Sequence, residues 1–245
     1  MDKNLLLLTG WGSTHRVWNL IIPALPASYQ IINVIPPWLQ NSQIAASLAG
    51  LDGYVDALAA RITAPVDVLA WSLGGLIALR LTQRYPGSVD KLLLVSSTPK
   101  FVAPDNHQTG IDYQWFSDFK SQFYRQPDKT LKRFQSLCAA GDKYGREVLR
   151  HLRSDALTSD FDLTECRLGL ALLERDMGQA YLDLDRPCCF IHGMQDSVVS
   201  AQSVLELTQQ TAAKLVLLDD TGHVPQLSHP ELLATHINAF LHSPY

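Results

Sequence analysis

Six short apolar runs, separated by stretches with a helical pattern, constrain the fold of this 245-residue chain more than any other feature. Each run suits a strand that is buried on both faces of a sheet. The predicted strands are Asn4–Thr9, Tyr29–Ile35, Pro65–Trp71, Asp90–Ser97, Pro187–Gly193 and Lys214–Asp219. Helical spacing is found at His15–Leu25, Gln43–Ile62, Leu73–Tyr85, Ala201–Thr211 and Pro230–Leu241. This alternation predicts an α/β fold with a mostly parallel, doubly wound sheet.

The alternation stops between Phe101 and Asp185. Helical patterns continue there, at Tyr113–Tyr124, Lys129–Ala140, Tyr144–Arg153 and Thr164–Met177, but we expect no strand. A helical insertion between two sheet strands predicts a cap over the carboxyl ends of the strands, where open α/β sheets place their ligands. We therefore expect a core of residues 1–100 and 186–245 and a helical cap of residues 101–185.

Composition narrows the class of protein further. A chain that is 47% hydrophobic and 18% charged is not expected to be disordered, and a net charge of −4 gives no overall attraction to nucleic acid or to an anionic membrane. No apolar run approaches the roughly 18 residues of a membrane-spanning helix, and the first residues do not resemble a secretory signal. We expect a cytoplasmic monomer without a nucleic-acid or membrane partner.

The four cysteines, Cys138, Cys166, Cys188 and Cys189, show no C-x-x-C spacing. We expect buried free thiols, no metal site and no cofactor. Because neighbouring residues of a strand point to opposite faces, the vicinal pair should be split between the two sides of the sheet.

A predicted strand runs directly into Ala70-Trp71-Ser72-Leu73-Gly74-Gly75 and then into a good helix. This is the strand, sharp turn and helix of a nucleophile elbow, G-x-S-x-G, with Ala70 in the place of the first glycine. Small residues are needed there because the turn packs strand and helix closely together. The alternative is a plain β–α turn in which Ser72 caps the helix.

Two further residues follow predicted strands in the chain order of an α/β-hydrolase triad. Asp196 comes shortly after the strand that ends at Gly193, and His223 follows the strand that ends at Asp219. We predict that His223 activates Ser72 as a general base and that Asp196 orients the imidazole. The alternative is a helix-capping aspartate and a loop histidine. The other histidines, including His192 at the end of a buried strand, are expected to be structural or solvent-exposed.

An acyl-transfer site also needs donors for the oxyanion of the tetrahedral intermediate. The first strand ends in Thr9-Gly10-Trp11-Gly12, a loop of the H-G-x-G type, which makes the backbone N–H groups of Trp11 and Leu73 the predicted pair. A plain glycine turn is the alternative.

These residues resemble the α/β-hydrolase superfamily over nearly the whole chain. Within it, the chain is similar to the family of esterases that hydrolyse pimeloyl-[acyl-carrier protein] methyl ester in biotin synthesis. The likeness rests on G-W-G at 10–12, W-S-L-G-G at 71–75, S-S-T-P-x-F at 96–101, Gly110-Ile111, and Arg133-Phe134 with Leu137 and Gly141. The chain departs from the family pattern at Thr9, at Ala70, and at residues 35–38, which replace a D-x-P-G-x-G loop. It also begins at what resembles the family's third strand.

The resemblance implies a serine carboxylesterase that frees the distal carboxylate of an acyl chain carried by acyl-carrier protein. The chain would lie in an apolar slot between core and cap, for which Trp11, Trp71, Leu73 and Phe134 are the candidate lining residues. Packing within the cap is the alternative role for these aromatic side chains.

The segment from Lys120 to Arg153 holds nine bases and three acids, a net charge of +6, so the rest of the chain carries −10. Acyl-carrier proteins are acidic, and a basic cap would steer such a partner toward the entrance. Lys129 with Arg133, and Arg146 with Arg150, are spaced i, i+4 and share a helix face, so we predict them as docking residues. The alternative is a solvated helix surface.

Two other functions stay open on the sequence alone. The same triad serves general carboxylesterases, thioesterases and C–C hydrolases, and the fold does not choose between them. A non-catalytic ligand receptor is the alternative from outside enzymes, although such receptors usually have a broken triad.

Overall fold

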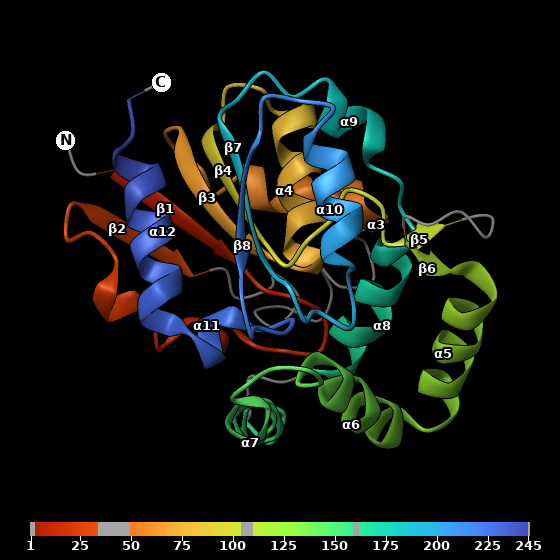
Figure 1. Cartoon of the computed structure of the whole chain (residues 1–245). Helices are drawn as coiled ribbons and strands as arrows, with labels where there is room; N and C mark the ends of the chain where they lie inside the picture. Colours follow the sequence, from red (N-terminus) through yellow and green to blue (C-terminus); the bar gives the residue numbers. More distant parts are fainter. Residues whose placement is uncertain (1–2, 34–49, 104–109, 159–161, 245) are drawn as a thin grey trace.

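The computed structural model describes residues 3–33, 50–103, 110–158 and 162–244 (Figure 1). Its main sheet has six strands in the order β2-β1-β3-β4-β7-β8, and every described strand pair in it is parallel. The strands are β1 (Lys3–Leu8), β2 (Tyr29–Asn33), β3 (Val66–Trp71), β4 (Val89–Val95), β7 (Cys188–Gly193) and β8 (Lys214–Leu218). All six predicted strands are therefore present in the described sheet, and their carboxyl ends share one rim.

Burial on both faces holds for the inner strands but not for the edge. Every residue of β3 and of β7 is buried, whereas β8 is buried only at Leu218 and exposes Lys214 and Leu217. At the other edge, β2 exposes Gln30 and buries none of its residues from 29 to 32 fully. The prediction of burial on both faces is therefore wrong for Lys214–Asp219 and for the described part of Tyr29–Ile35. An edge strand has one sheet neighbour, so solvent reaches side chains that a central strand would bury.

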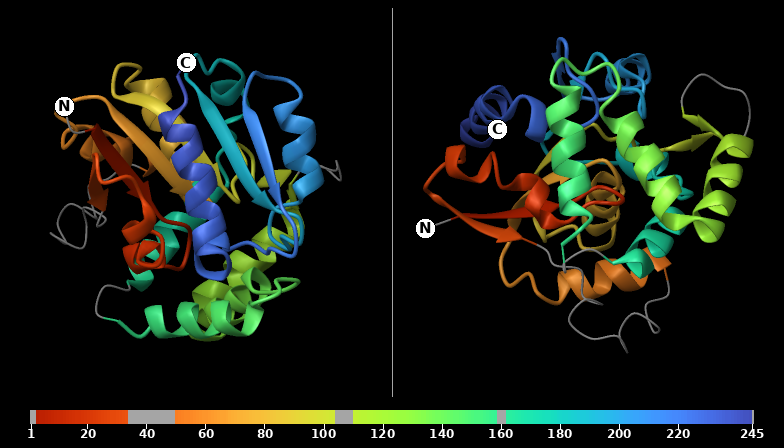
Figure 2. Two further views of the ribbon diagram at one scale, coloured as in Figure 1. Left: turned by 60° about the vertical axis from the view of Figure 1, so that its left-hand side comes forward. Right: turned by 90° about the horizontal axis from the view of Figure 1, so that it is seen from below.

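Helices cover both faces of the sheet, as a doubly wound fold requires (Figure 2). One apolar cluster joins the sheet to α3 (Gly50–Ala59), α4 (Leu73–Arg84) and α10 (Ala201–Thr208). The other cluster joins the opposite face to α12 (Pro230–His242) and the short 3₁₀ turn η1 (His15–Trp18). Cys188 lies in the first cluster and Cys189 in the second, and all four cysteines are buried, as predicted.

The helix predicted over His15–Leu25 is two 3₁₀ turns instead, η1 and η2 (Ile22–Ala24). Pro23 explains the break, because a proline inside a helix removes a backbone donor and clashes with the preceding turn. Of the helix predicted over Gln43–Ile62, α3 forms the described part, and residues 43–49 lie outside the described residues.

The segment between β4 and β7 forms α5 (Tyr113–Arg125), α6 (Pro127–Cys138), α7 (Gly145–Asp155), α8 (Leu163–Leu173) and α9 (Gly178–Leu182). It also contains a pair of two-residue strands, β5 (Val102–Ala103) and β6 (Ile111–Asp112), so the expectation of no strand there is wrong. Strands this short leave no period in a sequence. The chain just before this segment pairs with a later part of the segment. Lys100 and Asp176 form an isolated antiparallel β-bridge, and Nζ of Lys100 lies 2.7 Å from Oδ2 of Asp176.

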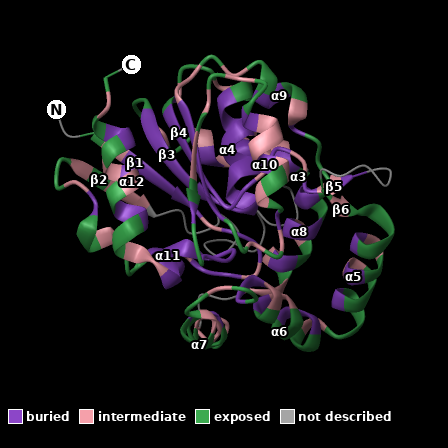
Figure 3. Cartoon of the chain, in the orientation of Figure 1, coloured by how far each residue is buried: buried purple, intermediate pink, exposed green. Residues whose placement is uncertain are grey.

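The cap helices share the core of the sheet rather than resting on its surface. The ring of Trp11, in the turn after β1, meets those of Phe119, Phe123 and Phe134 edge-on, with centroids 4.8 to 5.5 Å apart. Figure 3 shows the buried side of α5, α6 and α8 turned inward. Among the described residues, no helix combines the length and the apolar character needed to cross a membrane.

Candidate active site

Ser72 sits on a strained turn between β3 and α4. Its φ is 54° and its ψ is −120°, a conformation that costs a residue with a side chain of order 1–3 kcal/mol. The turn is too tight for side chains at the two glycines that follow. A Cβ on Gly74 would lie 2.7 Å from the carbonyl oxygen of Leu8, and one on Gly75 would lie 2.0 Å from Oγ of Ser97. This geometry is that of the predicted nucleophile elbow.

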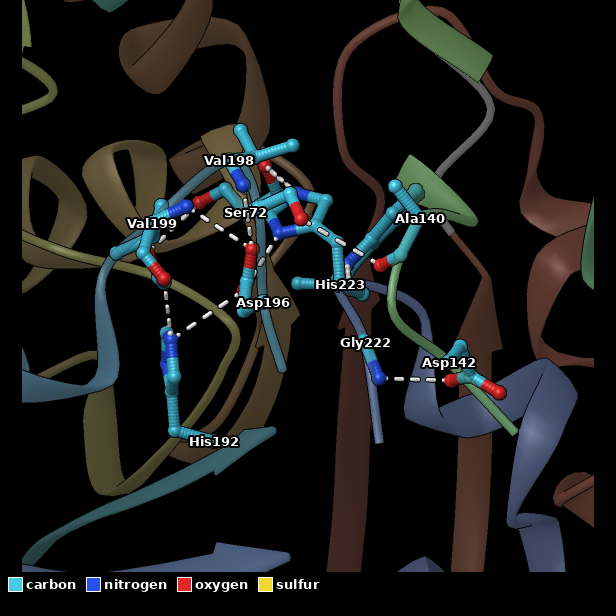
Figure 4. A network of polar contacts seen from close by, with 12 residues as sticks. Ser72, Ala140, Asp142, His192, Asp196, Val198, Val199, Gly222 and His223 are labelled. Atoms are coloured by element: carbon cyan, nitrogen blue, oxygen red, sulfur yellow. Dashed lines mark hydrogen bonds and ion pairs between the residues drawn. The ribbon is translucent and has the colours of Figure 1, made fainter. Parts of the chain in front are cut away.

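The structure brings Ser72, His223 and Asp196 together at the rim of the sheet (Figure 4). Nε2 of His223 lies 3.0 Å from Oγ of Ser72, and Nδ1 of His223 lies 2.8 Å from Oδ2 of Asp196. Only 3% of Ser72 and none of His223 is exposed. Because a carboxylate only accepts, Nδ1 carries the hydrogen, and Nε2 is left as the acceptor that faces the serine hydroxyl.

The carboxylate of Asp196 is buried and is surrounded by donors. Backbone N–H groups of Val198 and Val199 donate to Oδ1 over 2.8 and 2.9 Å, while His223 donates to Oδ2. Burial alone would raise the pKa of Asp196, but His223, its hydrogen bond and the further donors hold that pKa below its ordinary value. Asp196 is therefore an anion at neutral pH.

The cap holds the backbone around His223 in place. The N–H of Gly222 donates to Oδ2 of Asp142 over 2.7 Å, and the N–H of His223 donates to the carbonyl oxygen of Cys138 over 3.3 Å. Both acceptors lie at or after the end of α6, about 80 residues earlier in the chain. Sequence reasoning did not find Asp142, because a carboxylate in a loop carries no local signal of a distant backbone partner.

Trp71 lies on the opposite side of the sheet from the predicted slot. Its side chain belongs to the apolar cluster under α12, and its Nε1 donates to the carbonyl oxygen of His223 over 2.8 Å. The prediction that Trp71 lines the slot is therefore corrected: this residue supports the His223 loop from behind.

The predicted oxyanion loop lies against the elbow. Because Leu8 of β1 pairs with Ala70 of β3, the turn after β1 runs beside Ser72, and a Cβ on Gly10 would come within 3.0 Å of the Cβ of Ser72. Leu73 is the first residue of α4, where backbone N–H groups have no partner within the helix. The loop is anchored to the cap, since Nε1 of Trp11 donates to the carbonyl oxygen of Cys166 over 2.7 Å.

A cavity opens between this loop and the cap. Its walls come from the turn after β1, the first residues of α4, Tyr54 of α3, and α8. Of the four predicted lining residues, Trp11 and Leu73 form part of the wall. Phe134 is half-buried behind Trp11, with ring centroids 4.8 Å apart, and so supports the wall rather than forming it.

Glu165 places a carboxyl group in the wall of this cavity. Burial, and to a smaller extent the neighbouring Asp162, raises the pKa of Glu165 to about 8. At neutral pH the group is therefore mostly protonated and uncharged. The sequence offered no sign of this, because an ionisable residue in an amphipathic helix is ordinarily solvated.

The four predicted docking residues are exposed on α6 and α7. Within the described ranges, none of Lys129, Arg133, Arg146 and Arg150 forms an ion pair. The buried residues of the two helices, Leu131, Val148 and Leu152 among them, face the core instead. Arg133 donates a long hydrogen bond of 3.4 Å to the side chain of Gln122, and the charges of all four bases are not neutralised by a carboxylate in the described part of the chain, which keeps the docking hypothesis open.

The α/β-hydrolase fold family has a sequence model that matches residues 3–230, and the chain belongs to this family. The predicted fold is confirmed. The chain is 35% identical to the pimeloyl-[acyl-carrier protein] methyl ester esterase of Aromatoleum aromaticum, over 93% of this chain and 94% of that protein. It is 30% identical to the esterase of the same name from Aeromonas hydrophila, over 97% and 95% of the two chains. The predicted resemblance is confirmed by these relatives.

Among solved structures, a bromoperoxidase from Bacillus anthracis superposes with a TM-score of 0.81, over 99% of this chain and 93% of that one. At 20% sequence identity this similarity concerns the fold alone.

Asp142→Ala tests the support that the cap gives to the His223 loop. Loss of this carboxylate leaves the N–H of Gly222 without its acceptor, so we expect turnover of an aryl ester to fall and stability to drop by about 1–2 kcal/mol. Steady-state kinetics and urea unfolding measure the two effects. Asp128→Ala, an exposed carboxylate of the same cap, is the matched control. Equal turnover by the two variants would contradict the proposed support.

Glu165→Gln tests the raised pKa of Glu165. Folded Glu165 keeps its proton to about pH 8, whereas an unfolded glutamate releases it near about 4.3. The folded state therefore binds more protons between these values, and its stability falls as pH rises through that window. We expect the variant to lose less stability than the wild type between pH 5 and pH 9 in thermal melts. Parallel curves for the two proteins would rule out the buried, protonated carboxyl.

Proposed function

We propose that this chain is a serine carboxylesterase that hydrolyses the methyl ester of pimeloyl-acyl-carrier protein, with Ser72, His223 and Asp196 as its catalytic triad. The observation that carries the proposal is the pair of hydrogen bonds of His223, one to Ser72 and one to Asp196, at a strained elbow. The names of the relatives support the ester and the carrier. Neither a metal nor a cofactor takes part in the proposed chemistry, and the protein would work as a cytoplasmic monomer.

The first half of the proposed reaction forms an acyl-enzyme. Oγ of Ser72 attacks the ester carbonyl carbon, and Nε2 of His223 takes the hydroxyl proton. The N–H groups of Trp11 and Leu73 then stabilise the oxyanion of the tetrahedral intermediate. His223 returns the proton to the departing methoxide, which leaves as methanol.

The second half repeats these steps with water. His223 takes a proton from the water, whose oxygen attacks the acyl carbon, and the proton then passes to Oγ of Ser72 as the carboxylic acid leaves and loses its remaining proton to the solvent. Asp196 stays ionised throughout and stabilises the transient imidazolium. Its hydrogen-bonded, anionic state supports this role.

Substrate binding follows from the cavity and the cap. The acyl chain would lie along Trp11 and Leu73, with Phe134 and the cap behind them. The acidic carrier protein would approach α6 and α7, whose predicted docking bases are exposed. The insertion of residues 101–185 would then be a cap domain on a core of residues 1–100 and 186–245.

Ser72→Ala tests the mechanism. We expect turnover of aryl and dicarboxylate methyl esters to fall by about 10⁴-fold or more, because the oxyanion donors remain but the nucleophile is gone. A serine-reactive phosphonate should label the wild type at Ser72, as read by mass spectrometry, and should not label the variant. Ser136→Ala, on the exposed surface of the cap, should keep full turnover. Undiminished hydrolysis by Ser72→Ala would refute the proposed triad, whereas faster turnover of acyl thioesters than of methyl esters would refute the substrate.

Arg146→Glu combined with Arg150→Glu tests carrier docking. We expect kcat/KM for the carrier-bound methyl ester to fall by about tenfold or more at low salt, less at high salt, and to stay unchanged for a small aryl ester. Lys3→Glu with Arg61→Glu makes the same change in charge at the other end of the sheet and is the control. Equal losses on both substrates would assign these arginines to a solvated helix surface.

A further inference from the structure

His192 contacts the carboxylate of the triad from the side opposite to His223. It is the residue before the last of β7, and none of its side chain is exposed. Its Nε2 lies 2.9 Å from the carbonyl oxygen of Val199 and 3.2 Å from Oδ2 of Asp196 (Figure 4). A histidine expected to be structural therefore touches the carboxylate that orients the general base.

The hydrogen bonds of His192 determine where its proton lies. A carbonyl oxygen can only accept, so Nε2 carries a hydrogen that it donates to Val199, while Oδ2 of Asp196, 3.2 Å from the same nitrogen, makes an electrostatic contact with it. Burial lowers the pKa of His192, an effect that Asp196 and Val199 oppose only in part. The ring is therefore a neutral donor, and its Nδ1 has no hydrogen-bond partner within the part of the chain that is described.

The contact closes a ring of interactions around Asp196. Val199 accepts from His192 through its carbonyl oxygen and donates through its own N–H to Oδ1 of Asp196. Oδ2 then has one imidazole donor, His223 at 2.8 Å, and the N–H group of a second imidazole, His192, in electrostatic contact at 3.2 Å. The carboxylate cannot turn toward His223 or away from it without losing one of these contacts.

We propose that His192 is a positioning residue of the reaction. Its N–H group fixes Oδ2 of Asp196, so that the negative charge of this carboxylate interacts with His192 as well as with His223. The inference rests on the proposed function, since it acts through the triad. The titratable groups that act on His192 in the described structure are Asp196 and His223. The neutral N–H group of His192, 3.2 Å from Oδ2, attracts the carboxylate more weakly than the hydrogen bond from His223 at 2.8 Å does. The carboxylate therefore stays oriented toward the general base.

Loss of the His192 N–H group beside Asp196 should change the pH dependence of the reaction in one direction. The charge of Asp196 would then act on His223 alone and would favour the imidazolium, which is inactive as a base. The acid limb of the kcat/KM profile should therefore move to higher pH. A purely structural role for His192 would lower stability and would leave the midpoint of that limb unchanged.

The test compares two amides at position 192. In His192→Gln the side-chain amide can replace the Nε2–H donor, whereas His192→Asn is one methylene shorter and does not reach Asp196. With concentrations set by phosphonate titration, we expect His192→Asn to lose about threefold in kcat, because the lost interaction is a weak contact between an N–H dipole and a charge. Its acid limb should move to higher pH, and His192→Gln should restore most of both.

Phe190→Leu is the matched control, because Phe190 lies two residues earlier on the same buried strand and does not contact Asp196. It should lower the melting temperature and keep the wild-type pH profile. The inference is overturned if His192→Asn follows Phe190→Leu in its profile, or if the Gln and Asn variants behave alike. Hydrolysis that survives Ser72→Ala would instead overturn the proposed function itself.

Discussion

The positive φ of Ser72 is the constraint on which the rest of the site depends. A strained residue keeps its conformation only where its surroundings leave no alternative. Here the turn is held from both sides, since Gly74 packs against the backbone of Leu8 in β1, and the hydroxyl of Ser97, just after β4, donates to the carbonyl oxygen of Ser72 over 2.7 Å. The parallel register of β1, β3 and β4 brings these segments to one rim, so the sheet itself determines where the side chain of Ser72 points.

The second requirement is the burial of a charge. A carboxylate inside a protein is tolerated only when donors replace its water. The loop after β7 supplies two backbone N–H groups to Asp196, His223 supplies a side-chain donor, and His192 lies in electrostatic contact with the same carboxylate. Because His223 must also meet Ser72, its loop is held by Trp71 from the sheet and by Asp142 from the cap. The segment between β4 and β7 is thus part of the framework of the site.

The charged residues are distributed unevenly between the surface and the cavity. The chain has a net charge of −4, yet the segment from Lys120 to Arg153 carries +6. The structure places Lys129, Arg133, Arg146 and Arg150 on exposed surfaces of α6 and α7. In the cavity, by contrast, the carboxyl of Glu165 is mostly protonated and uncharged at neutral pH, because burial raises its pKa. A surface that attracts an acidic partner and a cavity that accepts an acyl chain would suit an ester carried by an acidic protein.

The sequence by itself determined the alternating α/β order, the elbow at Ser72 and the chain order of Ser72, Asp196 and His223, because these follow from local periodicity and from turns at strand ends. It did not determine which face Trp71 occupies, since a strand buried on both sides shows no alternation of apolar and polar residues. The roles of Asp142, Glu165 and His192 were decided only by tertiary structure. Each depends on a contact or a burial formed by segments far apart in the chain, and no local pattern of residue types records which groups the fold will bring together.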